Sequence, residues 1–245
     1  MKHFGLIGLP LTHSFSKKFF SEKFEREQIE AQYDLFELKH IADLSLLIEK
    51  HTFSGLNVTI PYKEKVIEFM DELDETASEI GAVNVIKFMR TKNKLRLKGY
   101  NSDAIGFENS LKPLLQDYHT KALILGTGGA SKAINYVLRK NGIQSIFVSR
   151  TEKPGMLTYS QLTEKVLHEN TVIINASPVG TYPHTDECPD IPYQFLTDKH
   201  LLFDVVYNPA ETLFLKKGKE KGAQILNGEA MLVGQAIAAW KIWNE

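Results

Sequence analysis

The feature that most constrains the fold is an apolar segment that runs without a break into a glycine-rich turn. Residues 121–125 read KALIL, and residues 126–133 read GTGGASKA. A short apolar run is typical of a buried strand, and glycine lets the backbone turn tightly beside a bound group. A helical pattern continues to about Arg139, and a second strand is expected at 145–149. This order predicts one βαβ unit with the glycine-rich turn between its first strand and its helix.

The same alternation of short apolar strands and amphipathic stretches extends along the 245 residues. Further strands are predicted at 4–8, 33–38, 55–59, 83–88 and 95–99, and then at 171–176, 201–206 and 224–226. Helical patterns lie at 15–28, 41–50 and 229–243. The pattern predicts an α/β protein of two domains, an N-terminal α/β domain and a Rossmann-like, doubly wound parallel sheet. We place the first domain at 1–103 with 228–245 and the second at 104–227.

Composition narrows the classes of partner. Lys and Arg total 29 against 30 Asp and Glu, so the net charge of -1 favours neither nucleic acid nor an anionic membrane as a partner. No apolar run approaches the roughly 20 residues that cross a bilayer, and the N-terminus lacks the features of a signal peptide. The single cysteine, Cys188, predicts no internal disulfide and a cytoplasmic location, and the histidine spacing predicts no metal site.

The glycine-rich turn predicts a dinucleotide site, because a helix N-terminus offers free N–H groups to a pyrophosphate. A purely structural turn is the alternative. The second strand ends in Ser149, Arg150 and Thr151, without the carboxylate that binds the ribose of NAD. The guanidinium of Arg150 suits a 2′-phosphate, so the residues favour NADP over NAD. A solvated surface arginine is the alternative interpretation of Arg150.

Two polar segments are candidates for the chemistry. In NVTIPYK, residues 57–63, Pro61 is expected to begin a helix and to place Lys63 in its first turn. In GYNSD, residues 99–103, Asp103 is either a functional carboxylate or the N-cap of a helix expected at 104–115. Lys63 and Asp103 are 40 positions apart, and this spacing alone does not bring them together.

Eight short motifs, taken in order, resemble the shikimate dehydrogenase family over nearly the whole chain. They are GLPLTHSFS (8–16), NVTIPYK (57–63), GAVN (81–84), GYNSD (99–103), GTGGASKA (126–133), SRT (149–151), NASPVG (175–180) and NGEAMLVGQA (227–236). The resemblance implies two α/β domains, one for the substrate and one for NADP, with the active site in the cleft between them. It also implies NADPH-dependent reduction of 3-dehydroshikimate to shikimate, a step of aromatic amino-acid biosynthesis.

The resemblance also assigns roles to residues. Lys63 would be the catalytic residue and Asp103 its partner. The substrate contacts would be Ser14, Ser16, Thr59, Asn84, Tyr207 and Gln235, with Ser14, Ser16 and Tyr207 holding the carboxylate. The cofactor contacts would be Gly126, Thr127, Gly128, Gly129, Ala130, Ser149, Arg150, Thr151, Val205 and Gly228. The protein would be a monomer or a homodimer.

The chain departs from the family pattern at several positions. Lys17 and Phe20 stand where Pro and His are usual, which leaves the start of the local helix open. Ser149 replaces Asn, Thr181 stands where Met is common, and Asn227 replaces Asp. His13, which lies between functional segments, is interpreted as a structural hydrogen-bonding residue and not as a base.

Three rival interpretations remain. A quinate/shikimate dehydrogenase that uses NAD is disfavoured by Arg150. A non-catalytic NADP-binding regulator on the same fold is disfavoured by the presence of both Lys63 and Asp103. A folate-type dehydrogenase on a related two-domain plan has no support from the serine pair Ser14 and Ser16.

Overall fold

The chain forms two compact units. A computed structural model describes residues 1–11, 14–92 and 94–245, so the prediction for His13 lies outside the described residues. The first unit comprises residues 1–102 and 235–245, and the second comprises 103–234. The two boundaries between these units fall within α4 (Ser102–Leu111) and α8 (Glu229–Asn244). The predicted α/β class with two domains is confirmed, whereas the predicted domain limits stay a prediction.

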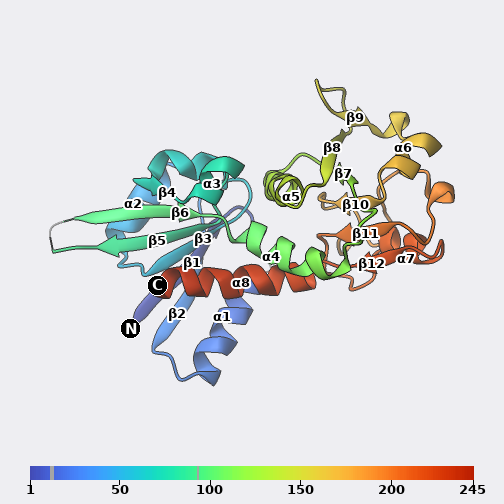
Figure 1. Cartoon of the computed structure of the whole chain (residues 1–245). Helices are drawn as coiled ribbons and strands as arrows, with labels where there is room; N and C mark the ends of the chain where they lie inside the picture. Colours follow the sequence, from blue (N-terminus) through green and yellow to red (C-terminus); the bar gives the residue numbers. More distant parts are fainter. Residues whose placement is uncertain (12–13, 93) are drawn as a thin grey trace. The chain divides into compact units, whose positions relative to one another are not determined.

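The sheet of the first unit has the order β2-β1-β3-β5-β6-β4 (Figure 1). Its strands are β1 (Lys2–Gly8), β2 (Ala31–Glu37), β3 (Gly55–Val58), β4 (Glu72–Leu73), β5 (Val85–Arg90) and β6 (Leu95–Tyr100). The five strands predicted here are present within two residues of their expected ends, and β4 was not predicted. β1 is parallel to β2 and β3, but β5 is antiparallel to both β3 and β6. The sheet is therefore mixed. Its antiparallel part includes β5 and β6, which follow each other in the chain and pair as a hairpin.

Helices cover both faces of this sheet (Figure 1). They are α1 (Phe15–Arg26), α2 (Asp43–Lys50), the 3₁₀ helix η1 (Lys65–Phe69) and α3 (Glu75–Ile80). One core cluster packs α2 and α3 against the sheet through Leu44 and Ala77. The other packs α1 and the end of α8 through Phe20 and Trp243. Phe20, at the position where the family usually has His, is fully buried and stacks on Tyr33 with ring centroids 4.9 Å apart.

The second unit has an entirely parallel sheet with the order β12-β11-β10-β7-β8-β9. Its strands are β7 (Lys121–Leu125), β8 (Gln144–Ser149), β9 (Leu157–Thr158), β10 (Val172–Asn175), β11 (Leu201–Asp204) and β12 (Gln224–Leu226). The chain starts in the middle with β7, builds outward through β8 and β9, and then returns to the other side of β7. This is the doubly wound order of a Rossmann sheet, with its topological switch point between β7 and β10.

The second unit is completed by short helices and a buried core. The helices of this unit, besides most of α4, are η2 (Lys112–Leu114), α5 (Gly129–Lys140), η3 (Tyr159–Gln161), α6 (Glu164–Glu169), η4 (Tyr193–Phe195) and α7 (Leu213–Lys219). The central strands β10 and β11 are buried at every residue. Continuous apolar runs suit this position, because a parallel sheet has both faces covered.

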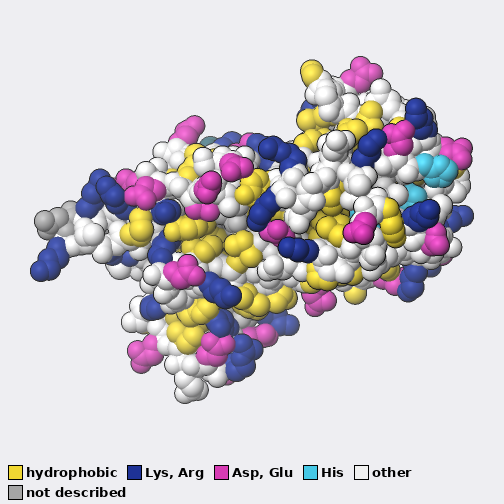
Figure 2. Space-filling model, viewed as in Figure 1, with side chains coloured by type: hydrophobic (Ala, Val, Ile, Leu, Met, Phe, Trp, Pro, Cys, Tyr) yellow, Lys and Arg dark blue, Asp and Glu magenta, His cyan; other side chains and the backbone are white. Residues whose placement is uncertain are grey.

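The surface carries mixed charge. On the face shown in Figure 2, Lys and Arg side chains are interspersed with Asp and Glu. Among the described residues, no helix is both long enough and apolar enough to span a membrane.

Candidate active site

Lys63 lies in a turn that is fixed to the sheet of the first unit by backbone bonds. The Tyr62 N–H donates to the Thr59 carbonyl at 3.0 Å and closes the turn. The Val83 N–H donates to the Lys63 carbonyl at 2.7 Å, and the buried Tyr62 hydroxyl donates to the Leu38 carbonyl at 2.5 Å. The predicted helix after Pro61 is wrong, since η1 begins only at Lys65. Lys63 is half-buried, in a turn whose backbone is held on both sides.

Asn84 forms hydrogen bonds with several residues of the first unit. Its Oδ1 accepts from the Ser102 N–H at 2.7 Å, and its Nδ2 donates to Gln235 Oε1 at 3.2 Å. Its backbone carbonyl accepts from the Val58 N–H at 2.9 Å and from Asn57 Nδ2 at 3.3 Å. Asn84 is 3 % exposed, so these bonds lie in a nearly dry environment. The structure therefore brings Asn84 and Gln235, two predicted substrate contacts, within hydrogen-bond distance of each other.

Thr59 lies one residue beyond β3. Its N–H donates to the Ile7 carbonyl at 2.9 Å, which continues the ladder between β3 and β1. Its methyl group packs against the Gly8 backbone, where an added Cβ would come within 2.4 Å of Thr59 Cγ2. Thr59 is half-buried, and its hydrogen-bonded backbone fixes the approach to the Lys63 turn.

Ser14 and Ser16 lie at the start of α1. Ser14 is the N-cap, and its Oγ accepts from the Lys17 N–H at 3.2 Å. Lys17 therefore does not displace the helix start, because it supplies the N–H that this cap requires. Ser16 is half-buried in the first turn of the same helix.

Asp103 lies in the first turn of α4 and is 2 % exposed. The alternative of an N-cap at Asp103 is wrong, because α4 begins at Ser102. The Ser102 N–H is capped instead by the side chain of Asn84. A carboxylate in the first turn of a helix is favoured by the helix dipole. Asp103 is assigned to the second unit and Lys63 to the first, so their pairing stays a prediction.

The glycine-rich turn lies at the switch point of the second sheet. Gly126 follows β7 with φ at +116°, a conformation that favours glycine, and an added Cβ would come within 3.3 Å of the Ala176 carbonyl. The Ala176 N–H in turn donates to the Leu125 carbonyl at 2.9 Å. The loop after β10 thus packs on the turn after β7, where doubly wound sheets bind their ligands.

The geometry of this turn fits a pyrophosphate. Gly128 is the N-cap of α5 and has no side chain to cap the first-turn N–H groups. Its φ of −82° is one that any residue adopts, and an added Cβ at Gly128 would meet nothing within 4 Å. Neither backbone strain nor packing in the described chain therefore requires glycine here. Glycine here leaves room for close approach of a bound group, so the residues present fit a dinucleotide.

Arg150 follows β8 and is exposed. The Thr151 N–H donates to Ser149 Oγ at 3.2 Å, which shapes the turn that presents the guanidinium. Arg150 also lies near Tyr159, where its positive charge lowers the pKa of the phenol, although burial outweighs this effect and raises it. The serine that replaces the usual asparagine thus has a defined role in the turn.

Val205, Tyr207 and Gly228 lie after β11 and β12. An added Cβ at Gly228 would come within 2.1 Å of the Val205 carbonyl oxygen, so glycine is required for the two segments to pack. Val205 follows the buried Asp204. Tyr207 is 40 % exposed on the loop beyond.

Asp204 anchors this region, and the sequence argument missed it. Its carboxylate accepts from Asn175 Nδ2 at 2.9 Å, the Val206 N–H at 3.0 Å and Thr212 Oγ1 at 2.6 Å. Burial raises its pKa from 3.8 to about 6, against the lowering effect of these bonds. A signal was available, because a carboxylate directly after the apolar run of β11 is expected to have a specific partner. Tyr33, whose buried hydroxyl donates to Asn57 Oδ1 at 2.7 Å, gave no local signal.

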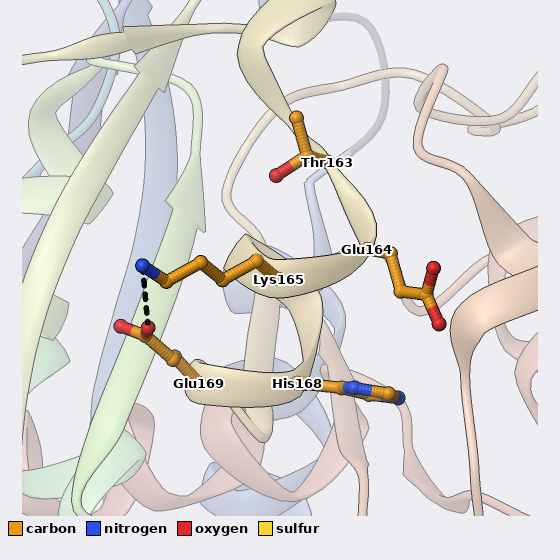
Figure 3. Close-up of a pocket in the computed structure, with 5 residues that line it drawn as sticks. All are labelled: Thr163, Glu164, Lys165, His168 and Glu169. Carbon is orange, nitrogen blue, oxygen red and sulfur yellow. Dashed lines mark ion pairs between the residues drawn. The ribbon is translucent and has the colours of Figure 1, made fainter.

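A surface hollow beside α6 contains none of the predicted site residues. It has a volume of about 500 Å³ and is lined by Thr163, Glu164, Lys165, His168 and Glu169 (Figure 3). Lys165 and Glu169 form an ion pair across it at 3.9 Å. Among the described residues, no group of three or more His, Cys, Asp or Glu side chains is placed to hold a metal ion. The hollow is an open, charged surface and not an enclosed ligand pocket.

The doubly wound sheet, with a glycine-rich turn at its switch point, defines the class of dinucleotide-binding α/β proteins. Residues 6–86 match the family model of the shikimate dehydrogenase substrate binding domain. The chain is 36 % identical to the shikimate dehydrogenase (NADP(+)) of Clostridium beijerinckii, covering 100 % of this chain and 93 % of the relative. It belongs to the shikimate dehydrogenase family, and these relatives are NADP(+)-dependent oxidoreductases.

Solved structures agree with this assignment. The shikimate dehydrogenase of Aquifex aeolicus superposes with a TM-score of 0.86 at 36 % identity, covering 100 % of this chain and 92 % of that one. The Thermus thermophilus shikimate 5-dehydrogenase, in complex with NADP(H) and shikimate, superposes with a TM-score of 0.85 at 29 % identity, covering 99 % and 93 %.

Proposed function

We propose that this chain catalyses the reversible NADPH-dependent reduction of 3-dehydroshikimate to shikimate. One observation carries the proposal beyond family membership. The turn that bears Lys63 is bonded to Val83, and the adjacent Asn84 binds both Gln235 and Ser102, the residue before Asp103. These bonds link the Lys63 turn, Asn84 and Gln235, three of the predicted features of the first unit. The Thermus thermophilus relative was solved in complex with NADP(H) and shikimate, which supports this pair of ligands.

In the proposed reaction, bound NADPH supplies the hydride. The residues of this chain then handle the proton and the charge. Reduction of a ketone builds negative charge on the carbonyl oxygen, and the Lys63 ammonium would donate a proton to it. Asp103 would orient Lys63, favour its charged form and accept from a substrate hydroxyl.

The remaining substrate contacts divide by chemistry. Ser14, Ser16 and Tyr207 are neutral hydroxyls, so the substrate carboxylate would be bound by hydrogen bonds and not by an ion pair. Thr59, Asn84 and Gln235 carry donors and acceptors that suit the ring hydroxyls. The first unit would supply all of these except Tyr207.

For the cofactor, the turn at Gly126–Ala130 would bind the pyrophosphate at the start of α5. Arg150 would bind the 2′-phosphate, with Ser149 and Thr151 beside it. Val205 and Gly228 would border the nicotinamide. We propose residues 1–103 and 228–245 as the substrate domain and 104–227 as the NADP domain. We also propose a cytoplasmic protein that is a monomer or a homodimer.

One spectrophotometric experiment at 340 nm tests the function. Shikimate and quinate are each crossed with NADP⁺ and NAD⁺. We expect turnover of shikimate with NADP⁺ and a kcat/KM with NADP⁺ far above that with NAD⁺. A ratio near one would favour the quinate/shikimate enzyme that uses NAD. Tight NADPH binding without turnover would favour the non-catalytic regulator.

A further inference from the structure

The two carboxylate oxygens of Asp204, at the end of β11, bind different parts of the second unit. Oδ1 accepts from Asn175 Nδ2 at 2.9 Å and from the Val206 N–H at 3.0 Å. Oδ2 accepts from Oγ1 of Thr212, the N-cap of α7, at 2.6 Å. Asp204 has no exposed surface. One oxygen therefore holds the loop directly after β11, and the other holds the start of α7.

Tyr207 lies on a short segment whose backbone is bonded on both sides. Before it, the Val206 N–H donates to Asp204 Oδ1. After it, the Asn208 carbonyl accepts from the Tyr182 N–H at 3.0 Å. The bond to Asp204 is buried, and a bond to an ionised group is stronger than one between neutral groups. The place of Tyr207 therefore depends on the Asp204 carboxylate.

The protonation state of Asp204 decides how its donors are satisfied. The Asn175 amide and the Val206 N–H only donate, so Oδ1 cannot carry a proton while it faces both. A proton taken up by Asp204 must go to Oδ2 and point at Thr212, which is 1 % exposed and would have to turn its own proton away. Oδ1 would then be a neutral carbonyl oxygen and a weaker acceptor for the Val206 N–H.

We propose that Asp204 is a positioning residue for Tyr207, which it acts on by holding the Val206 N–H with an ionised carboxylate. The inference rests on the proposed function, because that function assigns a contact with the substrate carboxylate to Tyr207. Val205 does not depend on the Asp204 side chain in this way, since its N–H donates to the Asn175 backbone carbonyl at 2.9 Å. Asp204 should therefore affect binding of the substrate more than binding of the cofactor.

The surroundings of Asp204 allow its titration to be followed by itself. Burial raises its pKa to about 6, and the groups bonded to it are uncharged. Tyr193 on η4 is exposed to the Asp204 charge, but burial already raises the pKa of its phenol far above the ordinary value of 10, so it stays neutral. On α7, the Lys217 ammonium donates to Cys188 Sγ at 3.3 Å, and the other lysines of that helix are exposed.

The test is the Kd of shikimate, measured by titration calorimetry on the full chain with NADPH present, so that both ligands are reduced and no hydride moves. At pH 7.5, Asp204→Ala removes all three bonds and should raise the Kd about tenfold or more. Asp204→Asn keeps an acceptor without the charge and should raise it about threefold. As the pH falls to 5, the wild-type Kd should converge on that of Asp204→Asn, because the wild-type carboxylate becomes neutral as well. Other titrating groups are common to both proteins and cancel in the ratio.

Two further variants show whether the effect passes through Tyr207. In the Tyr207→Phe background, which lacks the hydroxyl, Asp204→Ala should change the Kd of shikimate by less than about twofold. Thr212→Val is the matched control, because it removes the bond on the other carboxylate oxygen. It should leave the Kd of shikimate within about twofold. The Kd of NADPH should stay within about twofold in every variant, which also shows that each one has folded.

The inference is overturned if Asp204→Ala keeps its full effect in the Tyr207→Phe background, or if the ratio between Asp204→Asn and wild type does not change with pH. An equal loss of binding in Thr212→Val would also overturn it, because Asp204 would then act on the whole fold. If Asp204→Ala does not fold, the comparison of wild type with Asp204→Asn over pH decides alone. Binding without turnover would refute the proposed reaction while the affinities still decide this inference. A wild-type chain that does not bind shikimate refutes both.

Discussion

Replacing Asp204 by Asn should remove a pH dependence of stability that its burial creates. Asp204 has no exposed surface, and burial raises its pKa from 3.8 to about 6. Between these two pH values the folded chain binds a proton that the unfolded chain has released. The stability that this proton contributes is fully present below pH 3.8 and is lost as the pH rises through about 6. An asparagine does not titrate.

The magnitude follows from the shift. About two pKa units correspond to about 3 kcal/mol of unfolding free energy over the whole range, at roughly 1.4 kcal/mol per unit. About 2 kcal/mol of this falls between roughly pH 4.5 and pH 7.5. The wild-type chain should therefore lose that amount relative to Asp204→Asn as the pH rises. Burial also lowers the pKa of His119 and His200, which makes the chain less stable at low pH, but this effect is common to both proteins and cancels in the difference.

The assay is urea unfolding followed by far-ultraviolet circular dichroism at several pH values. Tryptophan fluorescence does not serve, because Trp240 and Trp243 both lie in the first unit and Asp204 lies in the second. Asp198→Asn, at an exposed position of the second unit, is the matched control and should show no change with pH relative to wild type. A difference between wild type and Asp204→Asn that stays constant with pH would refute the reasoning. A difference that grows in favour of wild type would show that the three donors outweigh burial.

Four further outcomes follow from the structure. Lys63→Ala should lower kcat by about 100-fold or more in the 340 nm assay, whereas Lys65→Ala, at an exposed position two residues on, should leave it unchanged. Arg150→Gln should raise the KM of NADPH about tenfold or more and leave that of NADH within about twofold; equal effects on both would contradict its contact with the 2′-phosphate. Gly55→Ala should destabilise the first unit by about 1–3 kcal/mol, seen by tryptophan fluorescence in urea, because the new Cβ would lie 2.2 Å from Trp243 Nε1. Gly128→Ala should leave the urea midpoint unchanged, because an added Cβ meets nothing within 4 Å, yet it should weaken NADP⁺ binding by calorimetry, because the Cβ would stand where the pyrophosphate approaches the turn; normal NADP⁺ binding would argue against a pyrophosphate site at this turn.

The sequence predicted the elements well where local pattern decides them. The apolar runs of β7, β10 and β11 and the glycine-rich turn after β7 were located correctly, because burial and backbone freedom act on neighbouring residues. The helix expected after Pro61 did not form, since the turn at Lys63 is held instead by a bond from Val83, about 20 residues away in sequence. β4, only two residues long, has too little pattern to be predicted.

The sequence named candidate site residues, and the structure adds contacts among some of them. Motifs singled out Lys63, Asp103 and the glycine-rich turn, because chemistry of this kind requires particular residue types at short spacing, and the roles of these residues stay predictions. The motifs gave no sign of Tyr33 or of its bond to Asn57, since strands β2 and β3 are separated by β1 in the sheet. Asn84 was expected as a substrate contact, and the structure adds that it caps the helix carrying Asp103.

The amino-acid sequence by itself determined the class of the fold, the position of the glycine-rich turn and the types of residue available for catalysis. These depend on the periodicity of apolar residues and on the steric freedom of single positions. Tertiary structure alone decided that β5 runs antiparallel, that Asp204 is buried among three donors, and that the buried Tyr33 hydroxyl donates to Asn57. The reason is physical: strand direction, desolvation and hydrogen-bond polarity are set by groups that approach each other only when the chain has folded.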